Sequence, residues 1–356
     1  MIKIEKLKKV YNNGYEALKS IDLNINEGEL ICLLGPSGCG KTTILNLLAG
    51  LLDPSSGDIK FDGESVINKH PKDRNIGLVF QNYALYPHMT VLENVMFPLT
   101  VGKNKKPKKE AMEIAKKYMK ITSIEELADK KPGEMSGGQQ QRVAITRALV
   151  QNPKILLLDE PLSNLDARLR LRIREEIRKL VKEIGITTIF VTHDQEEALS
   201  ISDRIVLMNE GIVQQFDIPQ NLYLEPSNLF VAKFMGNPII NTFNLKKNGN
   251  ILESKDFSID IDLLSKDRFK GELNEENYIL GIRPEYFKLS DTPLFKTTIN
   301  YVELIGKDCI LNFNVNEIDA RLITDINNKV SEGTEIGLDI DYSGIYIFKE
   351  NGERVY

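Results

Sequence analysis

A glycine-rich segment that directly follows a short apolar run is the feature that most limits how this chain can fold. Residues 30–34 read Leu-Ile-Cys-Leu-Leu, as expected of a strand that is buried on both faces of a parallel sheet. The next residues are Gly35-Pro36-Ser37-Gly38-Cys39-Gly40-Lys41-Thr42-Thr43, which fit the phosphate-binding pattern G-x-x-x-x-G-K-S/T. A strand, a glycine turn and a helix in this order predict an α/β domain.

The residue types in this segment, the phosphate loop (residues 35–43), suit a nucleoside triphosphate. Glycines let the backbone N–H groups wrap around the β-phosphate, where a Cβ would obstruct them, and the following helix presents its positive N-terminus to the anion. Lys41 is expected to reach the β- and γ-phosphates, and the hydroxyl of Thr42 to ligate Mg²⁺. An ordinary glycine-rich turn is the alternative, and the full match in the required context disfavours it.

A second apolar run, at residues 155–158, ends in the two carboxylates Asp159 and Glu160. It lies 118 residues after Lys41, counted to Asp159, and is typical of a Walker B strand. Asp159 would hold Mg²⁺ at the strand tip, and Glu160 would act as general base on the attacking water. Taken alone, a solvated strand end remains the favoured alternative for this pattern.

The pattern of strands and helices changes once along the chain. Up to residue 236, short apolar strands alternate with helical stretches, whereas residues 237–356 contain short β-rich segments separated by glycines. At roughly 100 to 200 residues per domain, the length of the chain also favours about two domains. We therefore expect an α/β domain at 1–236 and a small β-barrel or sandwich at 237–356.

Charge and composition exclude several classes of function. Residues 1–236 carry 32 basic and 30 acidic side chains, net +2, and residues 237–356 carry 14 and 21, net −7. Neither part has the basic excess that binding to a phosphate backbone requires, so no nucleic-acid partner is expected. The apolar runs are far shorter than the ~18 residues that cross a bilayer, and the N-terminus has no signal-peptide pattern. These features predict a cytoplasmic chain.

The segment Met135-Ser136-Gly137-Gly138-Gln139 lies 23 residues before Asp159, counted from Ser136. It resembles the signature motif of ATP-binding cassette (ABC) ATPases, usually Leu-Ser-Gly-Gly-Gln, with Met at the first position. Ser136 and Gly137 are expected to open a helix that ends before Asn152-Pro153, which supplies a second helix N-terminus for a phosphate. The resemblance implies a head-to-tail dimer in which this segment completes the nucleotide site of the partner chain.

Four further elements of that family match in order along the chain. Tyr11 corresponds to the aromatic residue that stacks on adenine, and Gln81 to the Q-loop glutamine. Residues 163–166, Ser-Asn-Leu-Asp, correspond to the D-loop, and His193 corresponds to the switch histidine. The resemblance assigns catalytic roles to Glu160, His193, Gln81 and Asp166, and metal contacts to Thr42, Gln81 and Asp159. It assigns nucleotide contacts to Tyr11, Gly35, Ser37, Gly38, Gly40, Lys41, Thr42, Thr43, Ser136, Gly137, Gly138 and Gln139.

Within this family the whole chain is similar to the importer ATPases of the maltose and multiple-sugar type. The supporting stretches are residues 191–198, residues 226–238 and Gly-Ile-Arg-Pro-Glu at 281–285. That resemblance implies an ABC cassette with a helical subdomain at about 82–152, followed by an OB-like, transport-associated domain. It also implies ATP and Mg²⁺ as cofactors. It also implies a dimer with a second copy or a paralogue, two transmembrane permease subunits and, indirectly, an extracytoplasmic solute-binding protein. The chain would then lie at the cytoplasmic face of the membrane.

Other cassette proteins fit less well. A tandem-cassette switch that acts on ribosomes would need two phosphate loops, and the chain has one. A DNA-repair cassette would need a long insertion between residues 50 and 135, and none fits there. An importer of polyamine, iron or sulfate has the same architecture, so it stays open as the alternative to a sugar importer.

Overall fold

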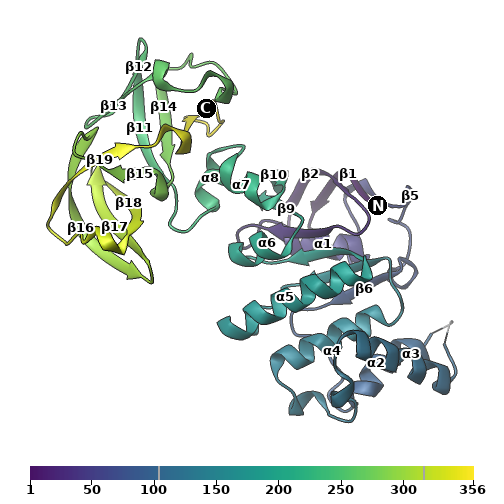
Figure 1. Cartoon of the computed structure of the whole chain (residues 1–356). Coiled ribbons are helices and arrows are strands. Elements are labelled where there is room, and N and C mark those ends of the chain that lie inside the picture. The colour runs from purple at the N-terminus through teal and green to yellow at the C-terminus, as the bar shows by residue number, and fades with distance from the viewer. Residues whose placement is uncertain (103–104, 316) are drawn as a thin grey trace. The chain divides into compact units, whose positions relative to one another are not determined.

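The computed structural model describes residues 1–102, 105–315 and 317–356, which divide into two compact units, Met1–Gln220 and Asn221–Tyr356 (Figure 1). This division lies earlier than the expected boundary at residue 236. The reason is α8 (Leu229–Phe234), whose buried Ala232 packs in one apolar cluster with Ile240 and Phe348 of the C-terminal unit. The short helix therefore belongs with the β-rich unit.

A six-stranded sheet forms the centre of the N-terminal unit. Its strands follow in the order β10 (Ile212–Asp217), β9 (Arg204–Asn209), β3 (Leu30–Leu34), β8 (Thr187–Val191), β7 (Ile155–Asp159) and β6 (Ile76–Val79). All neighbours pair in parallel except β10 and β9, which are antiparallel. The predicted strands at residues 30–34, 155–158 and 187–191 are confirmed, and the phosphate loop, the Asp159-Glu160 pair and His193 follow β3, β7 and β8. Because carboxyl ends of parallel strands meet at one sheet edge, these segments share that edge.

A second, antiparallel sheet covers helix α1 (Lys41–Ala49) in the same unit. Its strands follow in the order β2 (Glu16–Ile25), β1 (Ile2–Val10), β4 (Ser56–Phe61) and β5 (Glu64–Ser65). Apolar residues of both sheets and of α1 form one core, in which Ile44 and Leu45 are fully buried. Burial of one helix by two sheets fixes the helix N-terminus next to the phosphate loop.

Three helices form a separate group, in the lower part of Figure 1: α2 (Val91–Thr100), α3 (Lys108–Ile121) and α4 (Gly137–Leu149). They share an apolar cluster of their own that includes Val95, Ala115 and Val143. Thr90 caps α2 in a capping box with Glu93. All three helices lie inside the range 82–152 that the family resemblance implies for a helical subdomain.

The C-terminal unit consists of two five-stranded antiparallel sheets around one apolar core, which confirms the predicted β domain. The first sheet has the order β13 (Ser258–Asp260), β12 (Ile251–Glu253), β11 (Asn241–Asn248), β14 (Asn277–Ile282) and β20 (Ile345–Lys349). The second has the order β15 (Phe287–Leu289), β19 (Glu335–Ile340), β16 (Phe295–Ile305), β17 (Asp308–Val315) and β18 (Ile318–Asp325). The core includes a group of aromatic rings in edge-on and stacked contact, among them Phe243, Phe257, Phe287 and Phe295.

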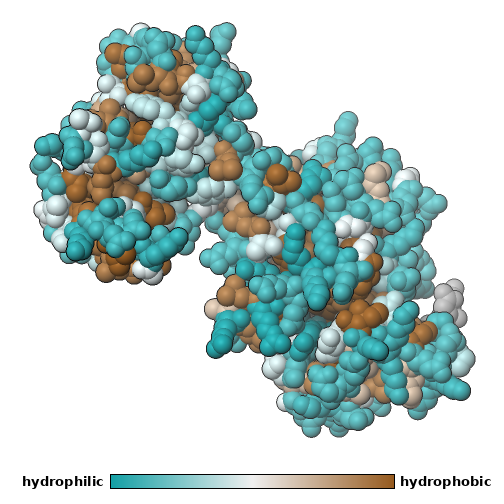
Figure 2. Space-filling model, in the orientation of Figure 1, coloured by the Kyte–Doolittle hydropathy of each residue, from teal (hydrophilic) through white to brown (hydrophobic). Residues whose placement is uncertain are grey.

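Hydrophilic side chains cover most of the face of the molecule that Figure 2 shows, with apolar side chains in scattered patches. Among the described residues, no helix combines the length and apolar character needed to cross a bilayer. All three cysteines, Cys32, Cys39 and Cys309, are free and buried.

Candidate functional site

The phosphate loop follows β3 and depends on glycine at two positions. Gly35 has a φ of 150° and Gly40 a φ of 109°, which L side chains rarely adopt. A Cβ on Gly35 would lie 2.2 Å from the carbonyl oxygen of Met208, and a Cβ on Gly40 would lie 2.8 Å from that of Ala17. Both the backbone conformation and the available space therefore require these glycines.

Lys41 is the first residue of α1 and is almost completely buried. Its Nζ donates hydrogen bonds to the carbonyl oxygens of Gly35, at 2.7 Å, and Pro36, at 2.9 Å. These bonds hold the ammonium group over the loop, beside the N-terminus of α1. A cation and a helix N-terminus at one place favour a bound anion.

The phosphate loop forms one wall of a cavity of about 620 Å³. The described residues that line it are Tyr11, Tyr15, Ala17, Ser37, Gly38, Gly40, Lys41, Thr42, Thr43, Glu160 and His193. Most of the predicted nucleotide contacts of this chain's own loop are therefore brought together with Glu160 and His193. A volume of this size is in the range of small-molecule sites.

Two tyrosines edge the cavity, and sequence reasoning identified only one of them. The hydroxyl of Tyr11 lies 3.2 Å from Oγ1 of Thr43, and Lys9 lies over the Tyr11 ring at 5.5 Å. Tyr15 is the residue that was missed, and its hydroxyl donates to the carbonyl oxygen of Gly38 at 3.0 Å. Nothing in the sequence around Tyr15 signals this bond, because it joins residues that only the fold brings together.

Asp159 and Glu160 stand at the end of β7, where the backbone turns sharply. Glu160 has a φ of 42°, in the left-handed region, which is uncommon for a residue with a side chain. Burial raises the pKa of the Asp159 carboxyl, the charge of Glu160 raises it further, and Lys41 lowers it. A nearby cation would stabilise the ionised form of Asp159. Carboxylate and hydroxyl oxygens from Asp159 and Thr42 are ligands that suit Mg²⁺.

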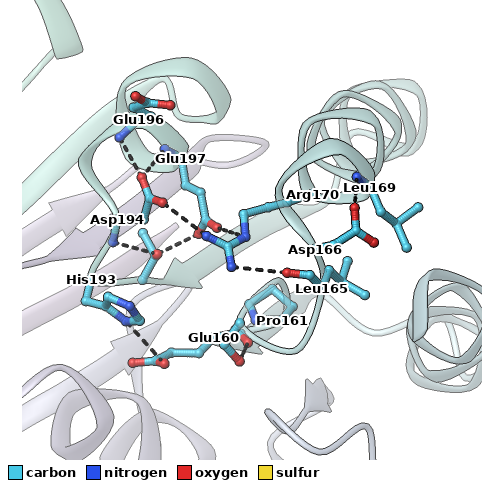
Figure 3. A network of polar contacts seen from close by, with 12 residues as sticks. Glu160, Pro161, Leu165, Asp166, Leu169, Arg170, His193, Asp194, Glu196 and Glu197 are labelled. Carbon is cyan, nitrogen blue, oxygen red and sulfur yellow. Dashed lines mark hydrogen bonds and ion pairs between the residues drawn. The ribbon is translucent and has the colours of Figure 1, made fainter.

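Glu160 is held from several sides, and Figure 3 shows its contact with His193. Its Oε2 lies 3.3 Å from Nδ1 of His193 and accepts a long hydrogen bond, 3.5 Å, from the amide of Gln81. Its backbone N–H donates to the carbonyl oxygen of Val191, at the end of the neighbouring strand β8. The carboxylate is therefore fixed between the ends of three parallel strands.

The Q-loop glutamine and the D-loop lie against each other. Gln81 follows β6, and its amide also donates to Oγ of Ser163 at 3.2 Å. Asn164 donates through Nδ2 to the carbonyl oxygen of Gln81 at 2.8 Å. Asp166 points elsewhere, since its Oδ1 caps helix α5 (Ala167–Ile184) by accepting from the N–H of Leu169. Within this chain Asp166 thus acts as a helix cap.

The signature segment begins helix α4, as the sequence predicted. The hydroxyl of Ser136 accepts from the N–H of Gln139, and the Gln139 side chain accepts from the N–H of Ser136, which completes a capping box. A Cβ on Gly137 would lie 2.8 Å from Cδ2 of Leu165 in the D-loop, so this glycine permits close packing. Among the described residues that line the cavity of the phosphate loop, none comes from residues 136–139.

Comparison with known proteins indicates the same family as the sequence motifs. Residues 18–163 match the family described as ABC transporter. The chain is similar to the trehalose import ATP-binding protein SugC of Mycobacterium tuberculosis, with 44% identity over 88% of this chain and 81% of SugC. It is also similar to the Fe(3+) ions import ATP-binding protein FbpC of Fusobacterium nucleatum, with 40% identity over 99% of this chain and 94% of FbpC.

A solved structure shares the fold of a large part of this chain. It is the dimeric structure of a post-hydrolysis state of the ATP-binding cassette MJ0796, bound to ADP and Pi. The match has a TM-score of 0.55 and 36% sequence identity, and it covers 62% of this chain and 99% of the other.

Proposed function

The chain belongs to the ABC transporter family as the ATP-binding and ATP-hydrolysing subunit of an importer, and on this basis we propose which residues carry out hydrolysis and which solute is imported. The observation that carries the proposal is the position of Glu160. Its carboxylate lies in the wall of the cavity that Lys41 and Thr42 also line, 3.3 Å from His193. A base at that place can accept a proton from a water molecule that attacks the γ-phosphate.

In this mechanism each group has a separate task. Backbone N–H groups of the phosphate loop and Nζ of Lys41 bind the phosphates, and the ring of Tyr11 stacks on the adenine. Glu160 accepts the proton of the attacking water, and His193 orients the Glu160 carboxylate through Nδ1. Thr42, Asp159 and Gln81 would hold Mg²⁺, which neutralises phosphate charge when it is bound.

The signature segment is proposed to act on a second chain. Ser136 and Gly137 open a helix N-terminus, but the cavity of the same chain takes its described lining from other residues. A head-to-tail dimer would place Ser136 of each chain against the phosphates bound by its partner. The dimeric state of the related cassette MJ0796 supports this arrangement.

The imported solute is proposed to be a carbohydrate. The relative SugC is named for trehalose import and is 44% identical, whereas FbpC, at 40%, is named for Fe(3+) import. The chain would bind two permease subunits at the cytoplasmic face of the membrane and respond to a solute-binding protein through them. ATP-driven closure of the dimer and its release after hydrolysis would drive the permease.

An uptake experiment tests the proposed solute. The gene is deleted, and accumulation of labelled trehalose, maltose, glycerol 3-phosphate, spermidine and Fe(3+) is measured before and after return of the wild-type gene or of Glu160→Gln. We expect uptake of one sugar or sugar derivative to disappear and to return only with the wild-type gene. Loss of Fe(3+) or spermidine uptake, with every sugar unchanged, would contradict the carbohydrate assignment and favour the alternative importer.

A further inference from the structure

Arg170, in the first turn of α5, joins the D-loop to the loop that carries His193 (residues 192–194, the His193 loop). Its Nη2 donates to the carbonyl oxygen of Leu165 at 3.2 Å. Its Nη1 donates to Oδ2 of Asp194 at 3.4 Å, and its Nε lies 3.5 Å from Oε1 of Glu197. One guanidinium group thus contacts the D-loop backbone and two carboxylates, as Figure 3 shows.

The two carboxylates fix the backbone on both sides of His193. Asp194 caps helix α6 (Gln195–Ile201) by accepting from the N–H groups of Glu196 and Glu197. The Glu197 side chain is only 5% exposed, and its Oε2 accepts from Oγ1 of Thr192 at 2.6 Å. The hydroxyl of Thr192 in turn accepts from the N–H of Asp194 at 3.0 Å. Every residue of the His193 loop other than His193 itself is therefore linked to this network.

The network borders the reacting groups directly. A small cavity of about 40 Å³ is lined by Arg170 and Glu197 together with Glu160 and His193. Because Nδ1 of His193 is 3.3 Å from Glu160, a shift of the His193 loop changes the contact that orients the carboxylate.

The other end of the network reaches the signature segment. Leu165, whose carbonyl oxygen accepts from Arg170, is a nearly buried residue of the D-loop. Its side chain packs so closely on Gly137 that a Cβ there would lie 2.8 Å away. The contacts therefore run without a gap from the start of α4, through Leu165 and Arg170, to the His193 loop.

We propose that Arg170 is a positioning residue for ATP hydrolysis. Through Arg170, the position of His193 relative to Glu160 would depend on the positions of the D-loop and of the signature helix. The inference rests on the proposed function, because the signature helix is there assigned to the nucleotide of the partner chain. Arg170 would thus couple the nucleotide at one site of the dimer to the catalytic groups of the other. A planar guanidinium suits this task, since it offers donors to three separate acceptors. The ammonium group of lysine instead concentrates its charge and its donors at a single point.

The experiment compares three variants of the full-length chain, Arg170→Gln, Arg170→Lys and Arg172→Gln. Arg172 is the matched control, because it lies on the same helix, is 74% exposed and pairs with Glu176 one turn away. We expect Arg170→Gln to lower kcat roughly 10- to 100-fold, as a misplaced catalytic group does, with the KM for ATP within about threefold of wild type. Arg170→Lys should recover only part of kcat, and Arg172→Gln should match the wild type.

A spectroscopic measurement separates positioning from a general loss of structure. The chain has three histidines, so the imidazole NMR signals of His193, His70 and His88 can be assigned by single substitutions. We expect Arg170→Gln to shift the His193 signals alone, and Arg172→Gln to shift none. A wild-type kcat in Arg170→Gln, or His193 signals that stay in place, would overturn the proposal.

Failure of this inference differs from failure of the proposed function. If Glu160→Gln hydrolyses ATP at the wild-type rate, the catalytic assignment itself is wrong, whatever Arg170 does. If Glu160→Gln is inactive while Arg170→Gln has a normal kcat, only the positioning role is excluded.

Discussion

The charged side chains of the candidate site in the N-terminal unit and the buried arginines of the C-terminal unit have different surroundings. In the N-terminal unit, Lys41, Asp159 and Glu160 stand at the carboxyl edge of a parallel sheet, and both Lys41 and Glu160 line an open cavity. In the C-terminal unit the guanidinium of Arg283 is fully buried and donates to the carbonyl oxygens of Tyr223, Ala232 and Met235. The charges of Lys41 and Glu160 thus face a cavity, whereas the guanidinium of Arg283 contacts carbonyl oxygens of its own unit.

A second arginine of the C-terminal unit shows the same pattern. Arg354 is buried and donates to the carboxylate of Glu225 and to the carbonyl oxygens of Pro226 and Tyr356. Arg283 also stacks on the ring of Tyr223 at 3.8 Å. These arginines hold the segment around α8 on the β sheets. Lys41 also donates to carbonyl oxygens, those of Gly35 and Pro36, so the feature that distinguishes this buried charge of the site is that it lines a cavity as well.

The largest expected effect tests the proposed catalytic role of Glu160 in the N-terminal unit. Glu160→Gln should lower kcat for ATP hydrolysis by at least roughly 100-fold, because the proposed general base is lost, while ATP binding stays within a few-fold. The control is Glu317→Gln, since Glu317 also has a left-handed backbone, φ 64°, but lies in the C-terminal unit. Steady-state hydrolysis and equilibrium ATP binding measure both effects. Near-normal hydrolysis by Glu160→Gln would remove this residue from the role.

The next effect concerns stability and not catalysis. Arg283→Met should lower the free energy of unfolding of the C-terminal unit by about 3 kcal/mol, because buried carbonyl oxygens lose their donor. Arg321→Met is the control, since Arg321 is exposed and should change stability by less than about 0.5 kcal/mol. Denaturant unfolding measures the change.

Under native conditions Arg283→Met should leave kcat for ATP hydrolysis unchanged. A fall in kcat of the folded variant as large as that of Glu160→Gln would break the division between the two units.

The smallest of these effects concerns the proposed stacking of Tyr11 on adenine. Tyr11→Ala should raise the KM for ATP roughly fivefold, about 1 kcal/mol for the loss of a stacked ring, with kcat unchanged. Tyr11→Phe keeps the ring and loses only the contact with Thr43, so its KM should match that of the wild type. Hydrolysis at varied ATP concentration distinguishes them. Equal effects of the two substitutions would show that the hydroxyl, not the ring, makes the contribution.

Local patterns in the sequence were sufficient to predict the strands and much of the site. The apolar runs at residues 30–34 and 187–191 are strands with those bounds, because burial on both faces leaves a continuous apolar pattern. Glu160 and His193 line the same cavity, because each follows a strand of one parallel sheet.

The residues that sequence reasoning missed depend on contacts between distant segments. Arg170 is one of several arginines on the polar face of α5, and only the packing of α5 beside α6 distinguishes it from Arg172. The earlier division of the units has the same cause, because Arg283 binds carbonyl groups that precede it by about fifty residues. Local patterns in the sequence do not indicate contacts between such distant segments.

The central claim is that two chains complete each other's catalytic site within the N-terminal unit. Ser136→Arg should remove the proposed signature contact, and Glu160→Gln should remove the proposed base, so each variant alone should be nearly inactive. Mixed in equal amounts before ATP is added, they form hybrid dimers in which one site has both groups intact. The control mixture pairs Glu160→Gln with a chain that carries both substitutions, since no hybrid site is then complete.

The most direct measurement is the steady-state rate of ATP hydrolysis by the first mixture. If dimers form at random, half are hybrids with one intact site of two, so the rate should reach roughly a quarter of the wild-type rate. The control mixture should stay at the level of the single variants. A rate in the first mixture no higher than the sum of its two components would contradict the shared site and assign hydrolysis to each chain alone.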